Sequence, residues 1–319
     1  MNFGENHRRK LISVVTPAYN EAENIGELIQ LVRLEFESKL TQYEYEHIII
    51  DNASSDETVA LVKEQCRLDP RIKLIVNARN FGHIRSPAHA MKQASGDAVI
   101  SIVADLQDPP ALISEFIRIW ESGRYKMVLG VKRSSAESSI LFSIRKIYYA
   151  LVTRLAEVDL IKNFTGFGLY DRQAIDAIRS IDDVYPYWRG LISEVGFSKY
   201  LYEYDQPARG GGISKNNFYT LYDIGMLGIT THSKLPLRFC TLFGFVSALL
   251  SFMLALGYLV IKILNWSDMQ LGIAPLVIGM FFFGSIQLMV IGLLGEYIGN
   301  IHTQVLKRPL VVELERVNF

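Results

Sequence analysis

Two long apolar runs near the carboxyl end constrain the fold of this chain more than any other feature. The first covers residues 237–264, and the second begins at Leu271 and reaches about Leu294, after the short polar segment NWSDMQ. Each run exceeds the roughly 20 residues that a helix needs to cross a bilayer. The sequence therefore predicts a hairpin of two transmembrane helices, the second ending near residue 296. Two buried helices of a soluble core are the alternative, which this length and apolarity disfavour.

The charges that flank these runs predict the orientation of the hairpin. The joining segment carries no Lys or Arg, whereas Lys234 and Arg238 flank the first run. His302, Lys307 and Arg308 follow the second run. Basic flanks favour the cytoplasmic side, and the N-terminal MNFGENHRRK lacks the apolar stretch of a signal peptide. We therefore expect a multi-pass protein of the inner (plasma) membrane, with its N-terminal domain and both termini in the cytoplasm.

Composition limits the other classes of partner. The 319 residues have a formal net charge of zero, so no global field attracts nucleic acid. The mean hydropathy of +0.18 reflects apolar residues concentrated after about Leu235. Cys66 and Cys240 lack the spacing of metal ligands and are expected to be free thiols.

Strand-like and helix-like segments alternate up to about Arg133. Helical spacing is found in NEAENIGELIQLVRLEFESKL and in SSDETVALVKEQCRL, where Ser54 precedes Glu57 at the spacing of a capping box. Strands are expected in KLISVVTPAY, YEYEHIIIDNAS, RIKLIVNARN, GDAVISIVAD and YKMVLGVKR. This alternation predicts an α/β fold with a mostly parallel sheet and helices on both faces.

Polar residues follow the expected strands at the edge where such sheets bind ligands. Asp51, Asn80, Asp105 and Arg133 each lie at or just past a strand end. In ADLQDPP, carboxylate and amide oxygens cluster after a buried strand, and Mg²⁺ and Mn²⁺ prefer such ligands. Taken alone, the cluster is more typical of solvated loop acids. Neither G-x-G-x-x-G nor G-x-x-x-x-G-K-[ST] is present.

Several motifs resemble, in type and order, those of the family-2 inverting glycosyltransferases. They are SVVTPAYNEAENI, IIIDNASSDET, NARNFGH, ASGDAVISIVADLQDPP and RGGGISKNNF. Together with GLLGEYIGNIHTQVLKRP, which closes the second apolar run, they make the whole chain resemble the polyprenyl-phosphate glycosyltransferases. These include the bactoprenol glucosyltransferases, whose layout of one catalytic domain and two membrane helices is the most similar, and the dolichyl-phosphate mannose synthases.

The resemblance implies a GT-A fold, Mg²⁺ or Mn²⁺ as cofactor, and inverting transfer of a sugar to polyprenyl (undecaprenyl) phosphate at the cytoplasmic face. Glucose from UDP-glucose is the expected sugar, for modification of a surface glycan such as the O-antigen of lipopolysaccharide. Mannose from GDP-mannose, or an amino sugar from another UDP-sugar, is the alternative. A homo-oligomer, a dimer or tetramer, is expected because the second run contains the small residues Gly272, Gly279, Gly284 and Gly292.

The resemblance also implies a role for each matching residue. The nucleotide-sugar is expected at Pro17, Tyr19, Asn20, Glu21, Asp51, Arg79, Asn80 and Asp105. The metal is expected at Asp105 and Gln107, and the lipid phosphate at Arg133, Arg145, Ser214 and Lys215. The catalytic set is Asp105, Arg133, Arg209 and Lys215. Asp159 and Asp171 are candidates for positioning groups, and neither is expected to be a base, since the lipid phosphate is already an anion.

Three positions depart from the family pattern. Val103 and Asn52 stand where the family has acids, and Gly168 stands where it has Arg. These departures keep open a non-catalytic membrane protein that binds sugar nucleotides. A processive or protein-directed membrane glycosyltransferase is the other rival class, but such enzymes usually have more membrane spans and a Q-x-x-R-W motif, which is absent here.

The expected organisation begins with a cytoplasmic GT-A catalytic domain over residues 1–215. Within it, apolar residues recur at helical spacing near 138–156, which predicts a helix on the membrane surface or, equally, one packed on its own domain. A juxtamembrane helix over 216–236, the two membrane helices within 237–298 and a cytoplasmic tail over 299–319 complete the chain.

Overall fold

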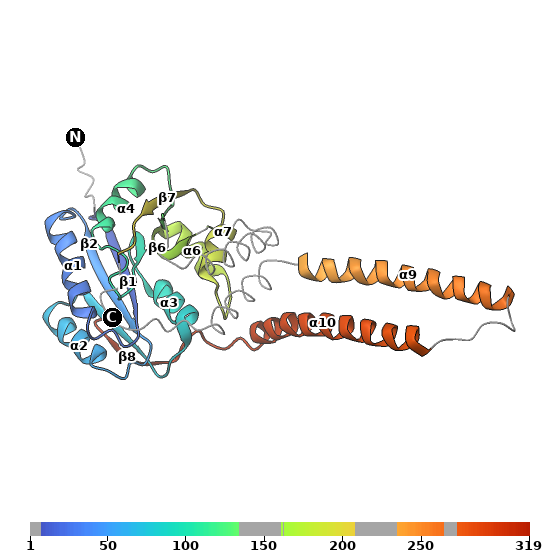
Figure 1. Ribbon diagram of the computed structural model, residues 1–319. Coiled ribbons are helices and arrows are strands. Elements are labelled where there is room, and N and C mark those ends of the chain that lie inside the picture. The colour runs from blue at the N-terminus through green and yellow to red at the C-terminus, as the bar shows by residue number, and fades with distance from the viewer. Residues whose placement is uncertain (1–7, 134–160, 162, 208–234, 265–272) are drawn as a thin grey trace. The chain divides into compact units, whose positions relative to one another are not determined.

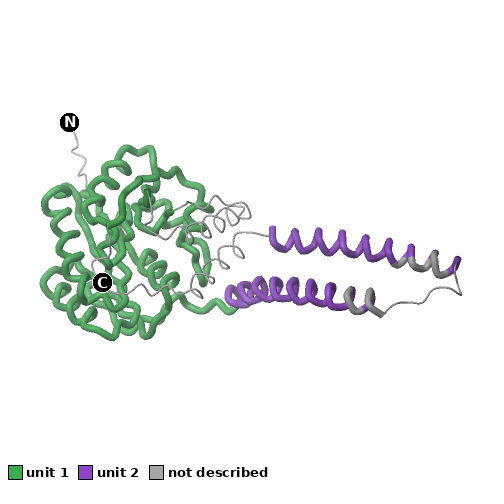
Figure 2. Tube along the Cα trace, viewed as in Figure 1, with its two compact units in different colours: residues 1–149, 158–217, 306–319 green, residues 150–157, 218–305 purple. Residues whose placement is uncertain are grey.

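The computed structural model describes residues 8–133, 161, 163–207, 235–264 and 273–319 (Figure 1). The chain divides into two compact units (Figure 2). Unit 1 comprises residues 1–149, 158–217 and 306–319, and unit 2 comprises residues 150–157 and 218–305. The helix predicted near 138–156 and nearly all of the one predicted over 216–236 lie outside the described residues.

Unit 1 is built on one mixed sheet of eight strands. Its spatial order is β7-β5-β6-β4-β1-β2-β3-β8. The strands are β1 (Leu11–Ala18), β2 (Glu44–Asp51), β3 (Ile72–Asn77), β4 (Ala98–Ser101), β5 (Met127–Lys132), β6 (Phe164–Asp171), β7 (Lys199–Tyr204) and β8 (Glu313–Val317). Four of the seven neighbouring pairs are parallel, including the central run β4-β1-β2-β3. The predicted α/β class is confirmed.

Helices cover both faces of this sheet because its central strands are apolar on both sides. In β2, Ile49 packs with one cluster of buried side chains, while its neighbours Ile48 and Ile50 pack with the other. The first cluster includes residues of α1 (Ile25–Ser38), α2 (Thr58–Leu68) and α4 (Leu112–Glu121). The second includes residues of α3 (Gly82–Gln93), α6 (Arg172–Ser180) and α7 (Trp188–Glu194). A continuous apolar strand therefore has a helix layer on each face.

Unit 2 contains the two long apolar helices. They are α9 (Leu235–Leu264) and α10 (Ile273–Val305), and each contains a segment long and apolar enough to cross a membrane. The predicted pair of helices is confirmed, but α10 continues nine residues beyond the predicted end at 296. The last turns of α10 contain polar residues but are still helical, so the helix does not end where the apolar run ends.

The C-terminal segment returns to the sheet as β8. It pairs antiparallel with β3, with Leu74 opposite Val317 and Asn77 opposite Glu313. Lys63 Nζ lies 2.6 Å from a Glu315 carboxylate oxygen, and the Asn318 amide donates to the Cys66 carbonyl at 2.8 Å. Residues after α10 thus complete one edge of the sheet, where a free edge would expose unpaired backbone groups.

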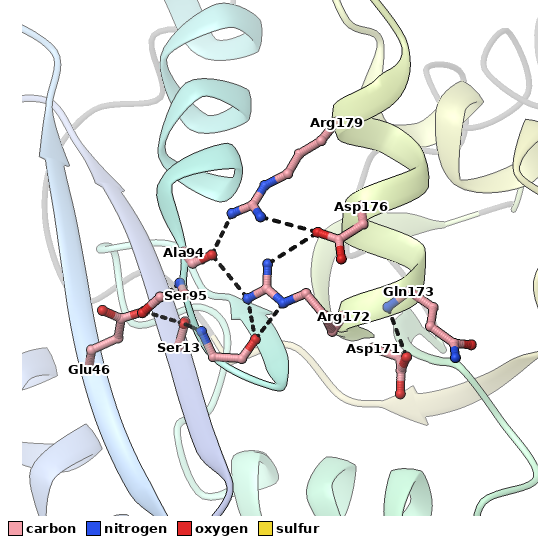
Figure 3. A network of polar contacts seen from close by, with 10 residues as sticks. Ser13, Glu46, Ala94, Ser95, Asp171, Arg172, Gln173, Asp176 and Arg179 are labelled. Carbon is pink, nitrogen blue, oxygen red and sulfur yellow. Dashed lines mark hydrogen bonds and ion pairs between the residues drawn. The ribbon is translucent and has the colours of Figure 1, made fainter.

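A polar network ties the amino ends of the strands together (Figure 3). The Glu46 carboxylate accepts hydrogen bonds from the Ser13 hydroxyl at 2.5 Å and from the Ser95 amide at 2.7 Å. Arg172 donates to the Ala94 carbonyl at 3.0 Å and also to the Gly96 carbonyl. Because these groups lie at the edge opposite the strand ends where ligands bind, the network is structural.

Candidate active site

The carboxyl ends of the central strands bring the predicted polar residues together. Ala18 at the end of β1 pairs with Asp51 at the end of β2, and Asp51 in turn pairs with Val76 of β3. β4 lies on the other side of β1, with Ser101 opposite Val15. The loops that follow these four strands therefore start from one edge of the sheet, as the sequence predicted.

The loop after β1 is fastened to the loop after β2. The Asn20 amide donates to the Ser54 hydroxyl at 2.8 Å, and the Asn20 side-chain oxygen accepts from the Ser55 amide at 2.8 Å. Asn20 adopts a φ of 54°, a conformation that Asn tolerates better than most residues. The Glu21 amide donates to the Thr58 hydroxyl at 2.9 Å. Pro17 lies within β1. Tyr19 comes directly after the end of β1 and is half-buried.

Asp51 is fully buried and faces its own loop. Its carboxylate accepts from the Ser54 amide at 2.9 Å and from the Ser54 hydroxyl. Burial raises the pKa of Asp51, while these hydrogen bonds oppose the rise. The predicted capping box is wrong, because α2 begins after Glu57 without a side-chain cap and the Ser54 hydroxyl is used by Asp51 and Asn20 instead.

Asn52 connects the loops after β2 and β3. Its side-chain NH₂ donates to the Asn80 side-chain oxygen at 2.9 Å, and its oxygen accepts from the Phe81 amide at 2.8 Å. The Arg79 guanidinium lies 4.0 Å from the centre of the Phe81 ring. Sequence reasoning treated Asn52 only as a departure from the family. The sequence did show that Asn52 directly follows an expected strand, and that the loop after the next strand also contains an Asn, Asn80.

The loop after β4 makes a tight turn that holds Asp105 partly exposed. Leu106 has a φ of 59°, and the Gln107 amide donates to the Asp105 carboxylate at 3.2 Å. Asp108 points inward and is 1% exposed, with the Tyr204 hydroxyl donating to it at 2.7 Å. Burial raises the pKa of Asp108 to about 6. Asp105 and Gln107 thus stay near solvent while Asp108 anchors the turn to β7.

The donor set at this turn fits a metal that is shared with a ligand. Among the described residues, no group of three or more His, Cys, Asp or Glu side chains could hold a metal ion. Asp105 and Gln107 supply one carboxylate and one amide oxygen. Mg²⁺ is commonly held by one or two carboxylates together with substrate phosphates and water. This turn therefore fits a phosphate-bridged ion and does not form an all-protein metal cage.

The predicted basic positions are only partly within the described structure. Arg133 follows β5 with its side chain 59% exposed, 3.7 Å from Glu203 and 3.6 Å from Asp205. Arg145, Arg209, Ser214 and Lys215 lie outside the described residues, as does Asp159. Whether Arg133 joins them at a lipid phosphate stays a prediction.

Two residues of the GFGLYDR segment have structural roles. A Cβ atom on Gly168 would lie 2.8 Å from the Val128 carbonyl oxygen, so a larger residue cannot enter this site without a shift. Asp171 caps α6 by accepting from the Gln173 amide at 3.0 Å and also accepts from the Trp120 indole at 2.8 Å. Asp171 is therefore a helix cap in the structure, away from the turn that carries Asp105.

Comparison with known proteins decides the family. The profile described as "Glycosyl transferase family 2" matches residues 13–179, which run from β1 into α6. The chain belongs to glycosyl transferase family 2. This glycosyltransferase is 34% identical over 300 residues to the SfII prophage-derived bactoprenol glucosyl transferase of Shigella flexneri, covering 93% of this chain and 96% of that protein. It is also 33% identical to the uncharacterized glycosyltransferase YkcC of Bacillus subtilis (strain 168), covering 94% and 92% of the two chains.

The chain also matches a solved structure, at lower sequence identity. The crystal structure of glucosyl-3-phosphoglycerate synthase from Mycobacterium tuberculosis, with Mn²⁺, UDP-glucose and phosphoglyceric acid, matches with a TM-score of 0.47 and 16% identity. The match covers 70% of this chain and 78% of that one. The family profile confirms the expected family, and the mixed sheet with helices on both faces confirms the expected α/β class.

Proposed function

We propose that this glycosyltransferase transfers glucose from UDP-glucose to polyprenyl (undecaprenyl) phosphate, with inversion at the sugar. The observation that carries the proposal is its 34% identity to a bactoprenol glucosyl transferase over 93% of the chain, long apolar helices included. The polar edge formed by the loops after β1, β2, β3 and β4 supports a nucleotide-sugar site at Pro17, Tyr19, Asn20, Glu21, Asp51, Arg79, Asn80 and Asp105.

The chemistry needs little from a general base. An oxygen of the lipid phosphate attacks the anomeric carbon as the bond from that carbon to the UDP oxygen breaks, so UDP leaves with the bonding electrons. The attacking phosphate is already an anion and has no proton to give up. The protein's tasks are to align the two reactants and to stabilise charge on the departing diphosphate. An α-linked donor then gives a β-linked lipid-phosphate sugar.

Asp105 and Gln107 would hold Mg²⁺ or Mn²⁺ beside the diphosphate. The ion, when bound, neutralises charge that develops on the leaving group. Val103 stands where the family pattern has an acid, so the donor phosphates would supply more of the ligands to the ion. Arg133 and Arg145, with Ser214 and Lys215, would bind the lipid phosphate, and Arg209 with Lys215 would close over both phosphates.

The same proposal places the catalytic unit at the cytoplasmic leaflet of the inner membrane. α9 and α10 would cross the bilayer as a hairpin, with both termini in the cytoplasm. A dimer or tetramer would form through close packing at the glycines of α10. The downstream use of the product would be glucosylation of a surface glycan.

Transfer to lipid tests the proposal directly. Purified full-length protein is incubated with polyprenyl phosphate and radiolabelled UDP-glucose, GDP-mannose or a UDP-amino sugar, and the label is followed into an organic extract. We expect acid-labile labelled lipid with UDP-glucose. EDTA should abolish it, and Mg²⁺ or Mn²⁺ should restore it. Asp105→Asn should lower the rate by roughly 100-fold or more, as loss of a group that stabilises transition-state charge does.

The control is Glu121→Gln, an exposed carboxylate at the end of α4, which should leave the rate unchanged. Labelled lipid only with GDP-mannose or the amino-sugar donor would replace glucose in the proposal. No lipid product with any donor would favour the non-catalytic binder. Undiminished transfer in EDTA or in Asp105→Asn would show that the metal and diphosphate roles are wrong.

A further inference from the structure

Three arginines gather where the chain passes from α10 to β8. Arg79 follows β3, Arg85 lies on α3, and Arg308 lies three residues beyond the end of α10. The Arg85 guanidinium donates to the Pro309 carbonyl and lies 5.4 Å from the centre of the Phe81 ring, over which Arg79 also lies. Burial, together with the charges of Arg79 and Arg308, lowers the pKa of Arg85. These three residues form the arginine cluster.

The positive charge of the arginine cluster is not balanced by the described parts of the chain. No carboxylate there forms an ion pair with any of the three guanidinium groups. The neighbouring acids have other partners: Glu313 pairs with His89 at 2.5 Å, and Asp182 pairs with Lys307 at 3.1 Å. The Arg85 Nε is buried without a hydrogen-bond partner. A buried donor that lacks an acceptor, beside like charges, indicates a site for an anion.

Chain length places Arg308 near the membrane surface. The 33 residues of α10 make a helix of about 50 Å, and a bilayer with its headgroups is about 40–45 Å thick. A spanning α10 therefore ends at about the level of the headgroups. Arg308 is three residues from Val305, and three extended residues reach at most about 11 Å. The cluster is therefore within reach of lipid headgroups.

We propose that Arg85 and Arg308 of the arginine cluster bind the phosphate groups of anionic phospholipids in the bilayer that α10 enters. Guanidinium groups present paired N–H donors that match phosphate oxygens. Arg85 and Arg308 come from different parts of the fold. Arg85 lies on α3, in a helix layer that covers the sheet of unit 1, whereas Arg308 follows α10 in the chain. Headgroups bound there would fasten α3, and with it the loop of Arg79 and Asn80, to the lipid surface. The proposal does not depend on which sugar is transferred.

The test uses the full-length protein in nanodiscs of phosphatidylcholine with a rising fraction of phosphatidylglycerol. Hydrogen exchange is measured for backbone amides of residues 82–93 and 306–312. We expect exchange to slow as the anionic fraction rises. Arg85→Gln or Arg308→Gln should raise the fraction needed for half the effect about fivefold, the contribution expected for one basic residue at an anionic surface. Arg79 is left unchanged, because the resemblance places it beside the donor.

Two control variants separate charge from structure. Arg118→Gln changes an arginine of α4 whose side chain is 73% exposed and should leave the lipid response unchanged. Arg85→Lys keeps the charge and should retain most of it. Exchange in α1 reports whether each variant is folded, and sugar transfer on the same discs is recorded separately.

Three results would overturn the proposal. One is exchange that does not respond to phosphatidylglycerol in the wild type. Another is a full response in a folded variant that lacks both Arg85 and Arg308. The third is equal protection by inorganic phosphate or UDP-glucose in neutral discs, because that would make the cluster a site for a soluble phosphate.

Discussion

At the scale of single residues, polar side chains at the carboxyl edge hold loops in place before any ligand arrives. Asn52 is the centre of one such group, since it donates to Asn80 and accepts from the Phe81 amide and from the Asn77 side chain at 3.1 Å. Its amide can both donate and accept, which a carboxylate cannot. The neighbours of Asn52 in this chain therefore suit an amide at this position, where the family pattern has an acid.

Asn52→Asp tests this match. The change restores the family's usual acid but turns a donor into an acceptor that faces the Asn80 oxygen 2.9 Å away. A buried polar group left without its partner costs about 1–3 kcal/mol. We expect a lower free energy of unfolding by that amount and a higher KM for the nucleotide-sugar, measured by denaturant titration and by transfer assays. Unchanged stability would contradict the role given to the Asn52 amide.

His47 makes stability depend on pH. It is buried in β2, with Nε2 2.9 Å from the Thr16 hydroxyl, and burial lowers its pKa to about 3. The unfolded chain binds a proton near pH 6.5, whereas the folded chain does not until about pH 3. Stability from this residue is therefore complete above pH 6.5 and decreases as the pH falls toward 3.

At pH 5 the loss should be about 2 kcal/mol relative to pH 7.5, from 1.36 kcal/mol per unit. Unfolding of full-length protein in detergent, monitored at both pH values, measures it. His47→Gln should show a smaller loss between the two pH values, because no imidazole remains to titrate. An equal loss in the variant would assign the pH dependence to other groups.

At the scale of elements, the close approach of strands in the antiparallel half of the sheet fixes residue size. Gly168 of β6 lies between Ser101 of β4 and Leu129 of β5. The space that an Arg would need at this position is taken by the Val128 backbone. A larger residue therefore enters position 168 only if the surrounding backbone shifts.

Gly168→Ala should lower the free energy of unfolding by about 1–3 kcal/mol, the usual cost of overpacking. The matched control is Gly26→Ala in α1, where an added Cβ meets nothing within 4 Å. That control should be neutral or should stabilise the protein by up to about 1 kcal/mol, because Ala favours a helix. Denaturant unfolding of both variants compares them. Equal effects would contradict the packing around Gly168.

At the scale of the whole molecule, the chain leaves the sheet, forms two long apolar helices and returns to add a final strand. α9 and α10 have 30 and 33 residues, or about 45 and 50 Å, so each is long enough to cross a bilayer. β8 completes the same sheet that β1 begins. In the proposed hairpin, both ends would therefore lie on one side of the membrane.

Cysteine labelling tests this topology. Ser267→Cys, in the segment that joins the two helices, should react with a membrane-impermeant maleimide on intact cells. Glu203→Cys, at an exposed carboxylate of β7, should react only after the membrane is permeabilised. Labelling of both sites from outside, or of neither, would contradict the proposed hairpin.

The amino-acid sequence by itself determined the features that depend on local pattern. Apolar length determined the two long helices, and alternation of strands and helices determined the α/β class. Strand-end polar residues such as Asp51 and Asp105 could be predicted, because parallel strands end at one edge. The matching motifs also identified the family.

Only the tertiary structure decided the features that depend on pairing between distant segments. β8, with the sequence ELERV, has no apolar alternation, and it is a strand because β3 offers it a hydrogen-bonding edge. Ser54 has the spacing of a helix cap, yet Asp51 and Asn20 take its hydroxyl. The arginine cluster likewise combines residues more than 200 positions apart, as the bond from Arg85 to Pro309 shows. Local pattern does not encode such contacts, because their energy depends on which surfaces the fold brings together.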